Sequence, residues 1–252
     1  MPESLLPPYE VVLPADEAGA WVVTCDHASN AVPPWVGGGD LGLPPEDMAR
    51  HIAYDVGAAG LALALARHLG APAILARFSR LVIDPNRGEY DPTLVMRLYD
   101  GSVIPANRRV TEGDVEARLD RLHRPYHDAL AALLADRPRA ALLAIHSFTP
   151  QLRGRLPRPW HVGVLHSHLD GRLARPLIAR LAADPGLVVG DNEPYSGHLP
   201  GDSVDRHALA SGRPNALVEV RNDLIGTREG QEAWAARVVP HLLGALKDME
   251  TS

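Results

Sequence analysis

Two apolar segments of the sequence lead directly into histidine-containing ends. The run "WVVTC" at residues 21–25 is followed by Asp26 and His27, and "LLAI" at residues 142–145 is followed by His146. Imidazole nitrogens are common zinc ligands, and a catalytic zinc site usually holds three protein ligands and one open position. If the fold brings these two ends together, the histidines predict a site for one divalent metal ion, which we expect to be Zn²⁺.

A third metal ligand can come from either of two residues. Asp55 in "HIAYDVG" offers a carboxylate, which suits zinc better than an amide oxygen does. Asn30 in "HASN" has the tighter sequence spacing to His27. The sequence leaves both candidates open.

Three further apolar runs also lead into polar residues. "RLVI" ends at residues 84–87, "LVVG" ends at residues 191–193, and "ALV" runs into Glu219 and then Arg221. Ligands of open α/β sheets bind where strands end at their carboxyl edge. We therefore expect all these groups to gather at one edge of a sheet.

The elements that must position these groups alternate between apolar runs and amphipathic segments. The predicted strands cover residues 20–25, 71–78, 80–84, 139–148, 161–168, 187–192 and 215–221. The predicted helices cover residues 46–69, 111–136, 171–183 and 227–247, with Thr111 as an N-cap and Pro125 as a possible break. This alternation predicts an α/β fold of three layers, with a mostly parallel or mixed central sheet and helices on both faces. We expect one domain over residues 1–252.

Composition narrows the class of protein. The formal charge of −6 argues against nucleic acid or an anionic membrane surface as a partner. Cys25 is the only cysteine, which excludes an internal disulfide and a multi-cysteine metal site. The first ten residues show no signal-peptide pattern, and no apolar stretch approaches the length of a membrane span. We expect a soluble, cytoplasmic protein.

Taken together, the motifs resemble those of the N-formylglutamate amidohydrolase family. In chain order they are "CDHASNAVP", "HIAYDVGA", "FSRLVIDPNR", "HRPYH", "AIHSFTP", "GDNEPYSG" and "ALVEVRNDLI". The resemblance implies a phosphorylase/hydrolase-like fold similar to that of the zinc carboxypeptidases. It also implies a metal-dependent hydrolase that cleaves a small N-formyl or N-acyl amino acid, such as N-formylglutamate, and releases formate. The histidine-degradation branch usually reads "PHSG" or "PHGG" where this chain has "DHASN", so the resemblance leaves the substrate open.

The resemblance also implies roles for individual residues. Carboxypeptidase-like folds place a catalytic glutamate on a late strand, which makes Glu219 the expected general base. They also place an Asn-Arg pair beside the substrate carboxylate, and Asn86 with Arg87 looks like that pair. We assign Arg87 to the substrate carboxylate or the oxyanion, and Arg80 to a second carboxylate contact or to support. The alternative is that either arginine pairs with Asp84.

Other residues are weaker candidates for substrate binding. Arg221 either faces the pocket or pairs with Glu219. The turn "DNEPYSG" is a candidate to present Asn192 or Tyr195 to the substrate, and His207 in "DRHA" matches a family motif and is a candidate to line the pocket.

Two other hypotheses fit some of the same residues. In the first, Cys25 is a nucleophile and His27 or His146 is its base. In the second, the chain is a non-catalytic carboxylate-binding protein of the same fold. The presence of Glu219 together with both histidines favours a metalloenzyme over either.

Overall fold

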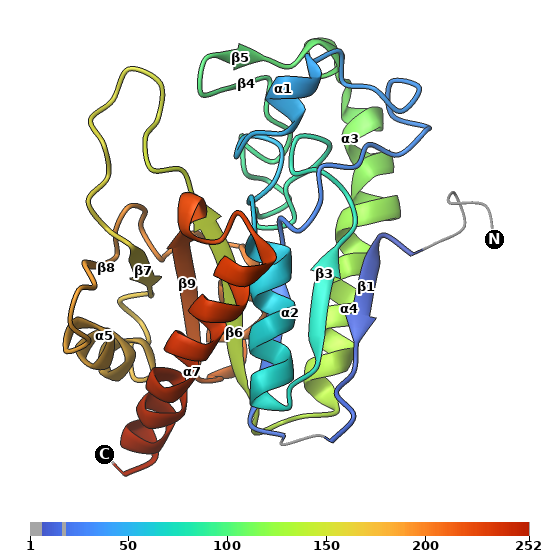
Figure 1. Ribbon diagram of the computed structural model, residues 1–252. Helices are drawn as coiled ribbons and strands as arrows, with labels where there is room; N and C mark the ends of the chain where they lie inside the picture. The colour runs from blue at the N-terminus through green and yellow to red at the C-terminus, as the bar shows by residue number, and fades with distance from the viewer. Residues whose placement is uncertain (1–6, 17–18, 252) are drawn as a thin grey trace.

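The computed structural model describes residues 7–16 and 19–251 (Figure 1). Most of the N-terminal segment that was inspected for a signal peptide therefore lies outside the described residues. A seven-stranded sheet forms the centre, in the order β1-β3-β2-β6-β9-β7-β8. Its strands are β1 (Tyr9–Val12), β2 (Trp21–Cys25), β3 (Ala73–Ala76), β6 (Ala141–Phe148), β7 (Val162–Leu165), β8 (Val189–Asp191) and β9 (Asn215–Arg221).

The strands of this sheet do not all run in one direction. β3, β2, β6 and β9 are parallel, so their carboxyl ends meet at one edge. β7 is antiparallel to β9, and β8 is parallel to β7, so these two strands end at the opposite edge. The expectation that residues 191–193 join the other polar strand ends is therefore wrong, because β8 points the other way.

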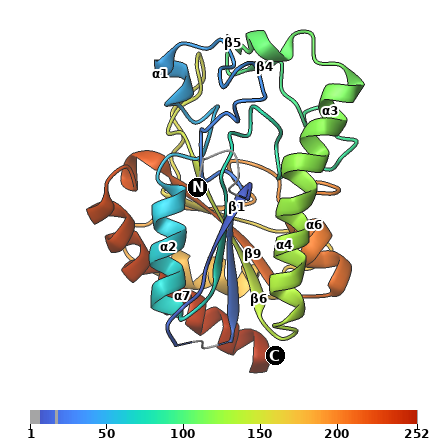
Figure 2. The same ribbon diagram turned by 90° about the vertical axis from the view of Figure 1, so that its right-hand side faces the viewer.

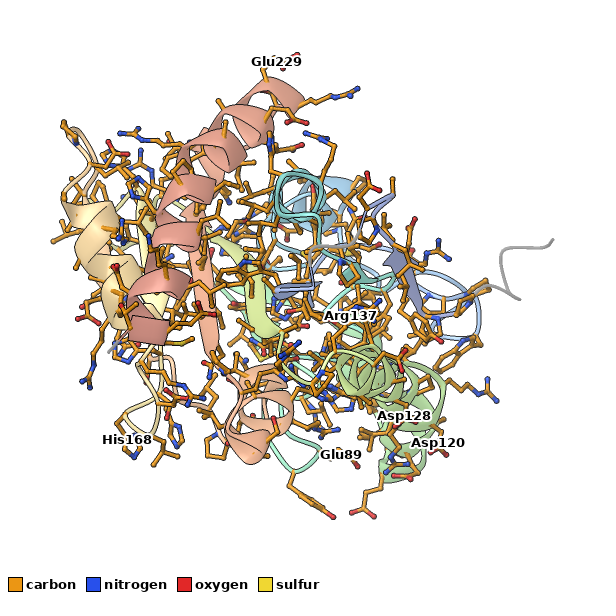
Figure 3. The ribbon with its side chains drawn as sticks, turned by 90° about the horizontal axis from the view of Figure 1, so that it is seen from below. Glu89, Asp120, Asp128, Arg137, His168 and Glu229 are labelled. Atoms are coloured by element: carbon orange, nitrogen blue, oxygen red, sulfur yellow. The ribbon has the colours of Figure 1, made fainter. Side chains whose placement is uncertain are left out.

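Helices cover both faces of the sheet (Figure 2). Alternate residues of β6 explain why: Leu143 and Ile145 belong to one apolar core, whereas Leu142 and Ala144 belong to the other. The first core packs α2 (Ala58–Leu69), α5 (Ala174–Ala182) and α7 (Arg228–Thr251), and the second packs α4 (Arg124–Ala135) and α6 (Ser203–His207). Seen from below, Glu229 of α7 and Asp128 of α4 lie on opposite sides (Figure 3). The predicted three-layer α/β fold is confirmed.

Shorter elements lie mainly between the large ones. They are α1 (Pro45–Met48), the two-stranded sheet β4 (Leu98–Tyr99) and β5 (Ser102–Val103), α3 (Glu112–Arg118), a π-helical segment (Leu119–His123), and short 3₁₀ helices at Pro105–Asn107, Leu209–Ser211 and Asn222–Leu224. Thr111 forms a capping box with Asp114 at the start of α3, as its sequence predicts. The break in the long predicted helix is the π-helical segment just before Pro125, which lies in the first turn of α4.

Two predicted elements are wrong, and both errors fall at the carboxyl edge of the sheet. The helix predicted at 46–69 is split, because α2 begins only at Ala58 and a turn carrying Asp55 precedes it. Gly57 in that turn has a φ of 80°, and a side chain there would clash with the carbonyl of Ile225. The strand predicted at 80–84 consists of turns and irregular backbone that pair with no neighbouring strand. The short strand β1 was not predicted.

None of the helices in the described part of the chain is both long and apolar enough to cross a membrane. The single domain over residues 1–252 stays a prediction.

The packing of α2 gives a direct stability test. Leu65 is fully buried, whereas Leu63 on the same helix is 38% exposed. We expect Leu65→Ala to lower the free energy of unfolding by about 2–5 kcal/mol, because it removes buried methyl groups and leaves a cavity. Leu63→Ala should change it by about 0.5 kcal/mol or less. Urea denaturation followed by circular dichroism measures both, and equal losses would contradict this packing.

Candidate functional site

A cavity of about 300 Å³ lies at the edge where the parallel strands end. Its lining comes mainly from the loops after β2 and β3, from the turn before α2, from the carboxyl-terminal parts of β6 and β9, and from the segment before α6. Among the residues singled out from the sequence, it is lined by His27, Asp55, Arg80, Asn86, Arg87, His146, Tyr195 and Glu219. The fold therefore brings most of the candidates to one place.

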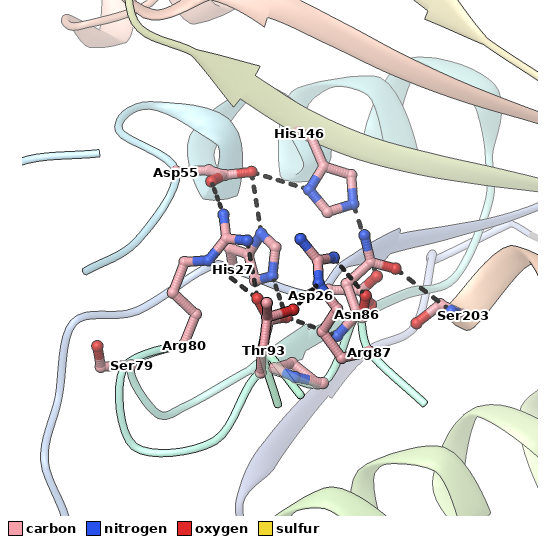
Figure 4. A network of polar contacts seen from close by, with 12 residues as sticks. Asp26, His27, Asp55, Ser79, Arg80, Asn86, Arg87, Thr93, His146 and Ser203 are labelled. Carbon is pink, nitrogen blue, oxygen red and sulfur yellow. Dashed lines mark hydrogen bonds and ion pairs between the residues drawn. The ribbon is translucent and has the colours of Figure 1, made fainter. Parts of the chain in front are cut away.

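The carboxylate of Asp55 lies between the two histidines (Figure 4). Its Oδ2 is 2.8 Å from Nδ1 of His146 and 3.3 Å from Nδ1 of His27. All three residues are buried, and each offers one ligand atom such that these atoms lie within 4.8 Å of one another. This geometry suits a small cation held by two imidazoles and one carboxylate.

A second carboxylate lies behind each imidazole ring. Nε2 of His27 is 2.7 Å from Oδ1 of Asp84, and Nε2 of His146 is 3.6 Å from Oδ2 of Asp26. A metal-binding histidine commonly donates its far ring N–H to a carboxylate, which fixes the ring and its tautomer. Nε2 of His27 is engaged by Asp84 in this way, whereas Nε2 of His146 only faces Asp26 and has no hydrogen-bond partner. Nδ1 of each ring lies on the side of Asp55. The sequence motifs do not by themselves predict these positions for Asp26 and Asp84.

The charges around Asp55 do not balance within the protein. Burial opposes ionisation of Asp55, but His27 and His146 outweigh it and hold the pKa of this carboxyl well below its usual range. Burial likewise opposes protonation of His146, but Asp26 and Asp55 raise its pKa well above the ordinary value. In the described part of the chain, the acidic groups around the cavity are Asp26, Asp55, Asp84, Asp202 and Glu219, and they outnumber its two guanidinium groups, Arg80 and Arg87. A divalent cation would offset part of this negative charge, so the donor set fits a metal ion.

The two arginines have different surroundings. Arg80 donates to Oδ2 of Asp84 at 2.8 and 3.1 Å and to Oδ1 of Asp55 at 3.4 Å, so it takes up the pairing with Asp84 that the sequence left open. Arg87 donates instead to Thr93 and to the carbonyl of Asn86. In the described part of the chain no ion pair joins Arg87 to an acidic side chain. Arg87 is therefore the cavity cation that is free to bind an anion.

Three histidines hold the segment that carries Arg87. His127 Nε2 is 2.9 Å from the carbonyl oxygen of Pro85, and His123 Nε2 is 2.9 Å from that of Arg87. His207 Nε2 is 2.9 Å from Nδ1 of His127. Burial lowers the pKa of all three, which favours their neutral forms. His127 can then donate from Nε2 to Pro85 and accept at Nδ1 from His207. His207 thus contacts His127, which holds the segment of Arg87, and it does not line the cavity.

Glu219 lies beside the cluster because β6 and β9 are in register. His146 and Glu219 are partners across the two strands. Burial raises the pKa of Glu219 to about 7, with Asp55 adding to the shift, and its Oε2 has no hydrogen-bond partner. Arg221 binds Asp223 and so does not neutralise Glu219. A buried carboxyl of this kind is suited to exchange a proton near neutral pH.

Several candidates lie outside the cavity lining. Asn30 is exposed, and its amide donates to the carbonyl of Met48, so Asp55 and not Asn30 lies between the histidines. The side-chain oxygen of Asn192 accepts from the backbone of His166 and Gly197, which holds a turn.

Cys25 does not have the surroundings of a nucleophile. It is fully buried in β2 and packs in the core beneath α2. Burial, with the charges of Asp55 and Asp26, raises the pKa of its thiol well above the usual value. A reactive cysteine needs the opposite shift. The structure thus speaks against the hypothesis of a cysteine nucleophile.

Comparisons with known proteins agree with this geometry. The sequence model of the N-formylglutamate amidohydrolases matches residues 19–226. A gene product from Agrobacterium tumefaciens with a known crystal structure shares 32% sequence identity with this chain. The alignment covers 97% of both chains, and the two structures superpose with a TM-score of 0.89. An N-formylglutamate amidohydrolase from Ralstonia eutropha is 24% identical over 98% of both chains, with a TM-score of 0.68. No curated protein gives a significant match.

The unusual pKa of Glu219 predicts a pH-dependent stability. The folded protein holds this proton more tightly than the unfolded chain does, so the group favours folding below about pH 4.5, and that contribution is lost as the pH rises through about 7. In chelator-treated protein, Glu219→Gln should remove this loss, which amounts to at most about 3 kcal/mol. Urea denaturation across this range tests it, with the exposed Glu229→Gln as control. Parallel stability curves for wild type and Glu219→Gln would contradict the assignment.

Proposed function

The chain belongs to the N-formylglutamate amidohydrolase family, and we propose that it is a metal-dependent hydrolase of N-formyl or N-acyl amino acids. The reaction would cleave the amide bond of a compound such as N-formylglutamate and release formate and the free amino acid. One observation carries the proposal: two imidazoles and a carboxylate surround one point beside a buried glutamate of raised pKa.

The metal in this proposal is one Zn²⁺ ion. Nδ1 of His27, Oδ2 of Asp55 and Nδ1 of His146 would hold it, and Asp84 and Asp26 would orient the two rings. Bound there, the ion would supply Lewis-acid chemistry that polarises an amide carbonyl and makes water more acidic. Because imidazole must be neutral to bind a metal, binding would displace a proton from His146.

The remaining steps belong to side chains of the cavity. Glu219 would take the proton of the attacking water and return it to the nitrogen of the departing amino acid. Arg87 would bind the α-carboxylate, with Asn86 beside it, because a guanidinium matches a carboxylate at two points. Tyr195, whose hydroxyl accepts from Arg158 at 3.0 Å, lines the cavity and is a further substrate contact. Arg80 would support Asp55 and Asp84 rather than bind substrate.

A test of the metal centre compares the two candidates for its third ligand. We expect Asp55→Ala to be isolated with little bound metal and to lose most of its formate-releasing activity, since the carboxylate lies between the two imidazoles. Asn30→Ala should keep both metal and activity, because Asn30 points to Met48. Elemental analysis and a formate assay measure the outcome.

The same assay separates the metalloenzyme from its rivals. Chelation should abolish formate release and added Zn²⁺ should restore it, whereas thiol alkylation should have no effect because Cys25 is buried. Metal-independent turnover, or full metal binding without any turnover, would contradict the proposed function.

The role of Glu219 is tested by an isosteric change. Glu219→Gln should keep its metal but lower kcat by about 10²–10⁴-fold, since it removes the group that transfers the proton. Glu193→Gln, at an exposed position, serves as the control. If Glu219→Gln retains wild-type kcat, another group is the base.

A further inference from the structure

One acidic residue of the cavity has no part in the proposed chemistry. Asp202 is 4% exposed and lines the cavity on the side of α6. Its Oδ1 accepts a hydrogen bond of 2.8 Å from the backbone N–H of Asp205, which caps α6. Its other oxygen, Oδ2, has no hydrogen-bond partner, and in the described part of the chain no basic side chain forms an ion pair with Asp202. A buried carboxylate without a counter-charge is costly, which suggests that a ligand supplies one.

Asp202 lies next to the place proposed for the amino-acid part of the substrate. The backbone N–H of Ser203 donates to Oδ1 of Asn86 at 3.3 Å, so the start of α6 is fixed against the segment that carries Arg87. The cavity wall here is also apolar: Leu165 and Leu217 are partners across β7 and β9, and Leu199 precedes Asp202 by one turn of chain. An aliphatic stem against these leucines would bring its polar end to Asp202.

The two arginines that line the cavity are not available to bind a second substrate carboxylate. Arg80 is committed to Asp84 and Asp55, and Arg87 is assigned to the α-carboxylate. Among the described residues that line the cavity, an acidic substrate side chain would therefore find no further arginine, and it would lie beside Asp202 and Glu219. Like charges at such close quarters repel strongly where water is scarce.

The pKa of Asp202 is consistent with a carboxylate that has no cationic partner. Burial raises the pKa of Asp202 to about 6, and the negative charge of Asp26 adds to the shift. A bound cation would reverse this effect and favour the carboxylate form.

We propose that Asp202 is a specificity-determining residue that binds a cationic substrate side chain, so that the preferred substrates are N-formyl or N-acyl derivatives of basic amino acids. This inference rests on the proposed function, and it names the amino-acid class that the reaction would release.

The experiment compares three substrates whose side chains are cationic, neutral and anionic: Nα-formyl-lysine, N-formyl-norleucine and N-formylglutamate. We expect wild-type kcat/KM for the lysine compound to exceed that for the norleucine compound by at least about tenfold, with glutamate lowest. Asp202→Asn should bring the lysine and norleucine values close together, chiefly by lowering the value for the lysine compound. Asparagine caps helices as well as aspartate does, so this variant keeps the start of α6. Asp205→Asn, next to it but outside the cavity lining, should retain the wild-type preference.

The outcomes separate this inference from the proposed function. A preference for N-formylglutamate, or a lysine preference that survives in Asp202→Asn, would overturn the role of Asp202 and leave a metal-dependent amidohydrolase intact. Absence of formate release from all three compounds would count against the proposed function. Calorimetric binding of Nα-formyl-lysine and N-formyl-norleucine to wild type and Asp202→Asn would then decide the inference without turnover.

Discussion

The arrangement of the cavity depends on one buried carboxylate, that of Asp55. It contacts both His27 and His146, and the backbone N–H of Ser147 also donates to its Oδ2. A buried charge of this kind is stable only when hydrogen bonds and opposite charges surround it. Those contacts fix the two imidazole rings relative to each other, with centroids 4.9 Å apart. The proposed metal site depends on these two rings, which are held at this distance by Asp55 before any ligand binds.

The sheet supplies the rigidity that this cluster needs. β2 and β6 are adjacent parallel strands, so the residues that follow them emerge side by side. β9 lies on the other side of β6 and pairs Glu219 with His146. Because all three strands are buried on both faces, their ends are fixed by packing rather than by the loops. Glu219, the proposed base, and His146, a proposed metal ligand, thus share one hydrogen-bonded ladder, which sets their spacing.

The sequence predicted the ends of the parallel strands well, and it predicted the segments between them poorly. His27, His146 and Glu219 follow or end continuous apolar runs, and such runs are recognisable without knowledge of the fold. The choice between Asp55 and Asn30 was not accessible, because it depends on a turn that interrupts an apparently continuous helix. The direction of β8 was equally hidden, since a parallel and an antiparallel strand have the same local pattern. Asp26 and Asp84 each stand near a site residue in the sequence, but their contacts with the far ring nitrogens arise only from tertiary structure.

The failed strand at residues 80–84 has a physical explanation that bears on the site. A strand that continued through residue 87 would point Asn86 and Arg87 to opposite faces, whereas both line one cavity here. An irregular segment removes that restriction, but it loses the ladder hydrogen bonds that would hold it. Backbone bonds from Arg80 to Ala53 and from Asp84 to Leu94 hold part of it. Side chains hold the rest: Arg118 donates to the carbonyl of Val82, and His127 and His123 bond the carbonyls of Pro85 and Arg87. The apolar residues Leu81, Val82 and Ile83 made this segment resemble a strand because they anchor it in the core. Its backbone is instead shaped by the need to bring consecutive polar groups to the same side.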